Sequence, residues 1–116
     1  MYRTSMISKD LVAASSRPLV LAILAESESY GYAIILRVKE LSGDQMQWTD
    51  GMLYPILHRL ERQGLIQSEW RQGESGRRRK YYKIVPEGKK ALTEEQRQWR
   101  VVQETLENIW RKPCHV

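Results

Sequence analysis

A run of four cations from Arg77 to Lys80 is the stretch whose residue types point most directly to a binding function. It follows the turn-forming segment Gln72 to Gly76 and precedes the β-prone pair Tyr81-Tyr82, which places the cations at or beside the tip of a hairpin. Guanidinium and ammonium groups gathered in this way neutralise phosphates, and the affinity that they give falls steeply as salt rises. The alternative is a solvated basic face that only improves solubility.

Four apolar residues before the hairpin recur at the i, i+3, i+4, i+7 spacing that lines one face of a helix: Leu53, Ile56, Leu57 and Leu60. The expected N-cap of this helix is Thr49 or Asp50. Six residues at its start and on its exposed side are candidates for contact with a phosphate or a base edge: Thr49, Asp50, Gly51, Tyr54, His58 and Arg59. For Tyr54 the alternative is packing against the hairpin.

The net charge of +5 is concentrated in the same part of the chain. Residues 51–84 hold eight basic and three acidic residues, which gives +5, whereas residues 1–50 carry −1 and residues 85–116 carry +1. A local excess of positive charge is what a surface for a polyanion requires.

Two helices are expected before this region. The helix over residues 9–25 contains Pro18, which predicts a kink or a fresh start because proline removes a backbone donor. Residues 27–30 are expected to form a polar turn. The second helix is expected over residues 31–41, where four apolar residues recur at helical spacing: Ile34, Ile35, Val38 and Leu41. Tyr32, near its start, either contacts a phosphate or packs under the first helix.

The second and third helices form a helix-turn-helix pair, in which the third helix enters the DNA major groove. Gln63-Gly64 ends the third helix, and the two strands of the hairpin are expected over residues 65–71 and 77–84. The expected fold class is mainly α with a small β-hairpin, a winged helix-turn-helix over residues 1–85.

A last helix is expected over residues 86–112, with Pro86 at its first position. Its apolar residues follow the alternating three-and-four spacing of a coiled-coil seam, with Glu95 as the one polar break and Val101 and Trp110 beside the seam: Leu92, Trp99, Val102, Leu106, Ile109 and Trp110. A small core cannot absorb a stripe of this length, so the surplus needs a partner chain. Residues 86–112 are therefore expected to be a C-terminal dimerisation helix, packed on the winged helix-turn-helix in one compact domain.

Several other classes of function find no support in the chain. The only cysteine, Cys114, excludes an intramolecular disulfide and indicates a reducing compartment, with the cytoplasm as the expectation. Cys114 and His115 with His58 do not supply the ligand set of a structural zinc site, so no metal is predicted. No nucleophile with a base, paired buried carboxylates or Gly-rich phosphate loop is found, so neither an enzyme nor a cofactor is expected. The apolar run of residues 19–25 is too short to span a membrane.

Several motifs occur in a characteristic order: Tyr30-Gly31-Tyr32-Ala33-Ile34, Gly51 to Leu57, Arg59-Leu60-Glu61, Gly64-Leu65-Ile66, Trp70, and Arg77 to Tyr82. In this order they resemble the PadR family of winged-helix transcriptional regulators, over roughly residues 19–92. The resemblance implies a cytoplasmic homodimer, usually a repressor, whose third helix reads the major groove while the wing reaches the neighbouring backbone or minor groove.

The single short helix after the wing resembles the smaller PadR subfamily. The resemblance implies a planar, hydrophobic effector bound between two protomers, with Trp99 as the aromatic that would stack on it; the alternative for Trp99 is dimer core. Two positions depart from the family pattern. Val85-Pro86 stands where a Thr usually caps the last helix, and Met52 stands where a smaller Thr is usual.

The sequence is thus interpreted as a homodimeric repressor that binds an inverted-repeat operator in double-stranded DNA and is released by an aromatic effector. Two alternatives from other classes remain open. One is a winged-helix adaptor that binds protein, and the other is a small-molecule binding protein with no role on DNA.

Overall fold

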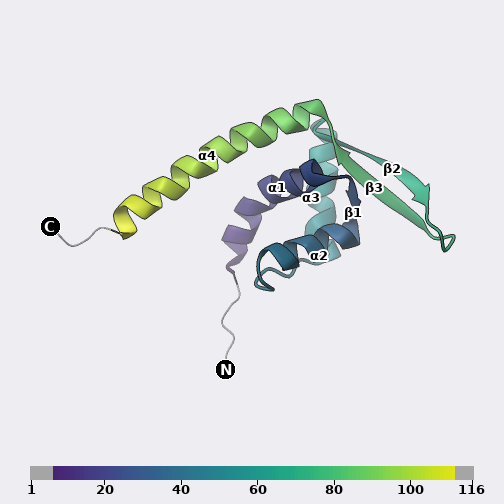
Figure 1. The fold of residues 1–116 in the computed structure, drawn as a ribbon, viewed down its shortest axis with the longest axis horizontal. Coiled ribbons are helices and arrows are strands. Elements are labelled where there is room, and N and C mark those ends of the chain that lie inside the picture. Colours follow the sequence, from purple (N-terminus) through teal and green to yellow (C-terminus); the bar gives the residue numbers. More distant parts are fainter. Residues whose placement is uncertain (1–6, 112–116) are drawn as a thin grey trace, which may run out of the picture.

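The computed structural model describes residues 7–111, which form four helices and a three-stranded antiparallel sheet (Figure 1). The elements follow the order α1 (Lys9–Glu26), β1 (Ser29–Tyr30), α2 (Gly31–Leu41), α3 (Asp50–Arg62), β2 (Ile66–Gln72), β3 (Arg78–Ile84) and α4 (Pro86–Trp110). This confirms the predicted winged helix-turn-helix with a C-terminal helix.

Pro18 lies inside α1, which continues as one helix from Lys9 to Glu26, so no new helix starts there. An interior proline costs about 3 kcal/mol because one backbone hydrogen bond is lost and the ring crowds the preceding turn. The residues after it are among the most buried of the core: Val20, Leu21, Ile23 and Leu24. Full burial of one such side chain stabilises the fold by about 1.5–3 kcal/mol, so together they outweigh the cost of the proline.

The helix-turn-helix pair follows the predicted boundaries closely. Thr49 is the N-cap of α3, since its hydroxyl accepts a hydrogen bond from the Met52 backbone N–H at 3.3 Å. Gly64, at φ +75°, follows the C-cap residue Gln63 and ends the helix in a left-handed conformation. Leu41 was predicted on the apolar stripe of α2, but it is 51% exposed because it is the last residue of a helix that is already leaving the core.

The sheet has the strand order β1-β3-β2, with Ser29 paired to Tyr82 and Ile66 paired to Ile84. The prediction of a plain polar turn over residues 27–30 is therefore wrong at its second half, where β1 forms. Two residues are too few to show the alternation that predicts a strand. Tyr30 of β1 packs edge-to-face on Tyr81 of β3, with ring centres 5.3 Å apart.

The core lies between the first three helices, the base of the hairpin and the first turns of α4. Gly88 allows α4 to start close to the body, because a Cβ at this position would overlap the Leu65 carbonyl oxygen. Arg17 of α1 forms an ion pair with Glu95 of α4. Beyond this point α4 extends past the rest of the molecule, and its side chains from Gln96 to Arg111 are all exposed (Figure 1).

Candidate nucleic-acid interface

The hairpin is a wing with two different faces. Residues alternate along β3, so Arg78, Lys80 and Tyr82 share one face, and Trp70 lies opposite Lys80 on β2. These four residues line a cleft between the wing and the two helices of the helix-turn-helix pair. The run of cations predicted at or beside the tip therefore continues from the turn along β3, where Arg78 and Lys80 share one face, and all four cations line the cleft.

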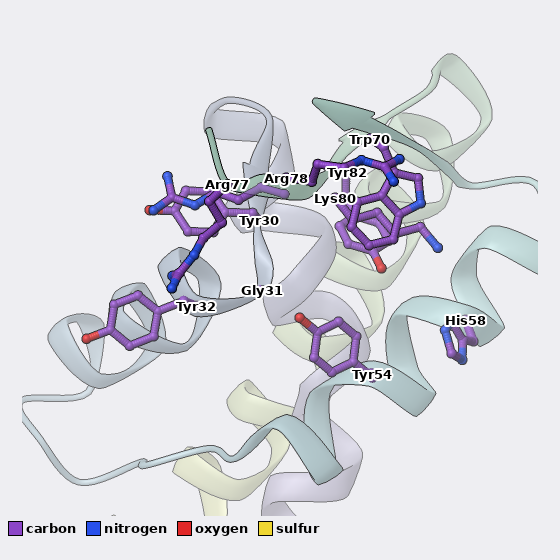
Figure 2. Close-up of a pocket in the computed structure, with 11 residues that line it drawn as sticks. Tyr30, Gly31, Tyr32, Tyr54, His58, Trp70, Arg77, Arg78, Lys80 and Tyr82 are labelled. Atoms are coloured by element: carbon purple, nitrogen blue, oxygen red, sulfur yellow. The ribbon is translucent and has the colours of Figure 1, made fainter. Parts of the chain in front are cut away.

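The cleft has a volume of about 490 Å³, and no acidic side chain lines it (Figure 2). The lining comes from the start of α2, the exposed side of α3 and the wing: Tyr30, Gly31, Tyr32, Tyr54, His58, Trp70, Arg77, Arg78, Arg79, Lys80 and Tyr82. Seven of the residues that the sequence predicts for DNA binding are thus brought together: Tyr32, Tyr54, His58, Arg77, Arg78, Arg79 and Lys80.

Aromatic rings hold three of the wing cations in place. The Arg78 guanidinium lies 4.8 Å from the centre of the Trp70 ring, and Lys80 Nζ lies 5.9 Å from the same centre. Arg79 lies over Tyr30 at 4.3 Å. Within residues 7–111, no residue of the run from Arg77 to Lys80 forms an ion pair. Their charges therefore remain available to an anionic partner.

Arg71, on the opposite face of the wing, is different. Its guanidinium donates to both oxygens of Glu28, at 2.7 and 2.8 Å, and to Glu69 at 2.7 Å. These hydrogen bonds raise the pKa of Arg71 and lower the pKa of Glu28. The charge of Arg71 is thus compensated inside the protein, although the sequence counts it with the other cations of the wing.

Tyr54 points from α3 toward the start of α2 (Figure 2). The contact is close, because a Cβ at Gly31 would overlap the Tyr54 hydroxyl. Gly31 is therefore required where α2 meets α3, and Tyr54 packs between two helices while still lining the cleft. Its packing partner is the start of α2, whereas the packing alternative weighed from the sequence was the hairpin; the predicted contact of Tyr54 with DNA stays a prediction.

Tyr82 is 1% exposed, and its hydroxyl has no hydrogen-bond partner within the described part of the chain. Burial raises the pKa of Tyr82 to about 12, with smaller contributions from Tyr54 and from Glu61. The Glu61 carboxylate accepts a hydrogen bond from the Ser68 hydroxyl at 2.7 Å, which joins α3 to β2.

The remaining DNA-binding candidates lie elsewhere on α3. Thr49 uses its hydroxyl for the N-cap, and Asp50 and Gly51 are exposed in the first turn. Gly51 and Arg59 line a second groove, of about 510 Å³, between α1 and α3.

Sequence reasoning missed four residues of the cleft: Tyr30, Gly31, Trp70 and Tyr82. The two-residue alternation of strands could have identified Trp70 and Tyr82, once Arg78 and Lys80 were assigned to one face. Gly31 and Tyr30 depend on a tertiary contact, for which the sequence has no local signal.

The residues predicted for a dimer or ligand interface separate into two groups. Leu92 is buried in the core of its own chain. The other five are exposed on α4: Trp99, Val102, Leu106, Ile109 and Trp110.

Metal and membrane features can be assessed for residues 7–111. No group of three or more histidine, cysteine or acidic residues there could hold a metal ion. Cys114 and His115 lie outside the described residues, as does Lys112 at the expected end of the last helix. None of the helices in the described part of the chain is long and apolar enough to cross a membrane.

A helix-turn-helix pair followed by a basic wing defines a winged-helix DNA-binding protein. The profile of the transcriptional regulator PadR-like family matches residues 20–94. The chain belongs to this family and is a DNA-binding transcription regulator.

Individual relatives agree with this assignment. A transcriptional regulator from Mycobacterium tuberculosis is 40% identical over 84 residues, which cover 72% of this chain and 75% of the relative. The structure of a transcriptional regulator from Clostridium thermocellum has a TM-score of 0.81 and 30% identity, and covers 92% of this chain and 100% of that one. A PadR family regulator from Eggerthella lenta has a TM-score of 0.74 and 35% identity, over 90% and 88% of the two chains.

Proposed function

We propose that this regulator is a homodimeric repressor that binds an inverted-repeat operator through α3 and the wing. The observation that carries the proposal is the cleft beside α3, which is lined by four wing cations and by no acidic side chain. A concave surface with charge of one sign attracts the opposite charge, here the phosphates of double-stranded DNA.

Specificity would come from α3, because the first residues of a recognition helix contact base edges in the major groove. Thr49, Asp50 and Gly51 begin this helix, and His58 and Arg59 are exposed further along it. The wing cations would bind the neighbouring backbone, which positions the protein and carries no base information.

The dimer would form through α4. On this proposal the chain consists of the winged helix-turn-helix of residues 1–85 and a dimerisation helix over residues 86–112. The exposed stripe on α4 supports this role, since a helix that projects from the body gains stability when a partner covers its apolar side chains. Two-fold symmetry then requires half-sites about one helical turn, or a multiple of it, apart.

An aromatic, planar effector would bind between the protomers, with Trp99 stacked on it. It would weaken DNA binding if it prefers a protomer spacing that does not match the half-sites. Calorimetric titration of flat aromatic compounds tests this step. We expect binding to the native protein and loss of binding in Trp99→Ala, with Trp70→Leu as a control that leaves α4 unchanged. Equal binding by Trp99→Ala would contradict the assignment.

The DNA-binding role is tested by removing both cations that lie on the cleft face of β3. We expect Arg78→Ala with Lys80→Ala to weaken operator binding in fluorescence anisotropy. The plot of log affinity against log salt should become shallower by about 1.8, because each phosphate contact contributes about 0.9.

A matched control removes the same charge from α4. Lys89→Ala with Lys90→Ala, both exposed and outside the cleft, should leave the salt dependence nearly unchanged. If the first double variant binds DNA as tightly as the native protein, the adaptor alternative is favoured instead.

A further inference from the structure

The start of α2 borders the cleft and has backbone donors without a capping group. The N-cap residue Tyr30 makes no side-chain hydrogen bond to the helix, and the first turn contains no acidic residue. The first N–H groups of a helix have no partner within the helix, and the helix dipole places partial positive charge there. Such an end binds anions, phosphates above all.

The Tyr82 hydroxyl is an independent sign of a ligand at the same place. It has no partner among residues 7–111 although its side chain is 1% exposed, whereas most buried polar groups in native structures are hydrogen-bonded. Figure 2 shows this hydroxyl directed between Tyr54 and His58, facing the cleft that Gly31 borders. A hydroxyl kept in this position without a partner fits a donor that is satisfied when a ligand enters.

The surroundings select a negatively charged ligand. Lys80 Nζ lies 5.8 Å from the centre of the Tyr82 ring, and both residues line the cleft, so an ammonium group lies close to this tyrosine. Arg77, Arg78 and Arg79 line the same cleft. Charge-assisted hydrogen bonds from several donors at once are characteristic of phosphate sites.

We propose that the floor of the cleft is a phosphate-binding site, in which the first-turn N–H groups of α2 and the Tyr82 hydroxyl together bind one phosphodiester of the operator backbone. The site rests on the proposed DNA-binding function and adds to it a specific contact with one backbone phosphate between the wing and the helices. Tyr82 is then a binding residue, although its burial alone suggests only a core role.

Tyr82→Phe tests the site, because it removes one oxygen and keeps the ring. Loss of an unpaired buried hydroxyl is neutral or stabilising for a folded protein. We therefore expect thermal stability to be unchanged or higher, while operator affinity falls about tenfold. Tyr81→Phe, on the opposite face of β3, is the matched control and should retain native affinity.

Operators that carry a single neutral methylphosphonate at successive positions locate the contact. The native protein should lose affinity at one phosphate in each half-site, and Tyr82→Phe should show no further loss at that phosphate. If Tyr82→Phe binds the operator as tightly as the native protein and loses the same affinity at every methylphosphonate position, the phosphate site is refuted. The proposed DNA-binding function is not affected by that result. If the native protein binds no operator at all, the proposed function fails as well.

Inorganic phosphate, titrated without DNA at constant ionic strength, distinguishes the source of the anion. If phosphate stabilises the native protein but not Tyr82→Phe, the phosphate site is supported. If the methylphosphonate operators then show no effect, the ligand of the site is a free phosphate and not the DNA backbone. A thermal shift that is equal in both proteins, without a methylphosphonate effect, would overturn the site.

Discussion

At the residue scale, the contact between Gly31 and Tyr54 fixes how the two helices of the helix-turn-helix pair meet. We expect Gly31→Ala to lower the free energy of unfolding by about 1–3 kcal/mol, because the added Cβ overlaps the Tyr54 hydroxyl and the Tyr54 ring must move. Urea unfolding measures the change. Tyr54→Phe should relieve part of the loss, which would appear as coupling in a double-mutant cycle.

Gly51→Ala is the matched control for this prediction. An added Cβ at Gly51 meets only the Thr49 hydroxyl oxygen, at 3.8 Å, and the position lies in the first turn of α3. Alanine favours a helix over glycine by about 0.5–1 kcal/mol, so the variant should be as stable as the native protein or more so. Equal destabilisation by both substitutions would show that the Tyr54 contact does not constrain position 31.

The buried Tyr82 predicts a specific loss of stability in alkali. Its pKa is raised to about 12 in the folded protein, above the ordinary value of 10, because burial disfavours the phenolate. The unfolded chain therefore loses this proton first, and the free energy of unfolding should fall between about pH 10 and pH 12. The difference between native protein and Tyr82→Phe, measured by urea unfolding across this range, isolates the contribution. An identical pH dependence of both would contradict it.

At the element scale, the wing combines cations that are free with one that is compensated. We expect Arg71→Ala to leave the salt dependence of DNA binding unchanged, because Glu28 and Glu69 already neutralise that guanidinium. Stability should fall only slightly, because exposed ion pairs contribute little to the free energy of unfolding.

Arg78→Ala removes one charge from the cleft face of the same wing and provides the comparison. Its plot of log affinity against log salt should become shallower by about 0.9, if one phosphate contact is lost. Should Arg71→Ala reduce the slope equally, the compensated Arg71 and Arg78, which is unpaired within residues 7–111, would not differ in their availability to DNA.

Most elements of this fold could be predicted because their residues repeat with a clear period. The stripe Leu53, Leu57 and Leu60 identified α3, and Gly64 identified its end. The strand β1 was missed because its pairing with β3 is a tertiary contact between segments about 50 residues apart. The sequence left open whether α1 kinks or starts afresh at Pro18, since the burial that outweighs the proline is a property of the folded core.

The candidate site was predictable to the extent that its residues are neighbours in sequence. The cations from Arg77 to Lys80 could be found from their types alone, but the aromatic rings that hold them come from other strands. Compensation of Arg71 by Glu28 joins residues 43 apart, so counting charges along the chain cannot reveal it.

At the scale of the whole molecule, α4 extends away from the winged helix and carries apolar side chains in solvent, with Ile109 and Trp110 67% and 72% exposed. We expect Val102→Glu to convert the proposed dimer into monomers, because the substitution places a charge on the apolar stripe. Sedimentation velocity measures the change, and operator affinity should fall with it because two half-sites can no longer be bound together.

Val101→Glu is the control for this experiment, since Val101 is equally exposed but lies beside the stripe. It should remain dimeric. A native protein that sediments as a monomer at micromolar concentration would contradict the role proposed for α4.

The central claim is that the cleft and α3 together recognise a specific DNA sequence. The most direct test is fluorescence anisotropy with labelled DNA from upstream of the protein's own gene and with a scrambled duplex, each at two salt concentrations. We expect tight binding to the native fragment that persists at the higher salt, while binding to the scrambled duplex is lost. Equal, salt-sensitive binding to both duplexes would contradict specific recognition of this fragment and leave only nonspecific attraction to the basic wing.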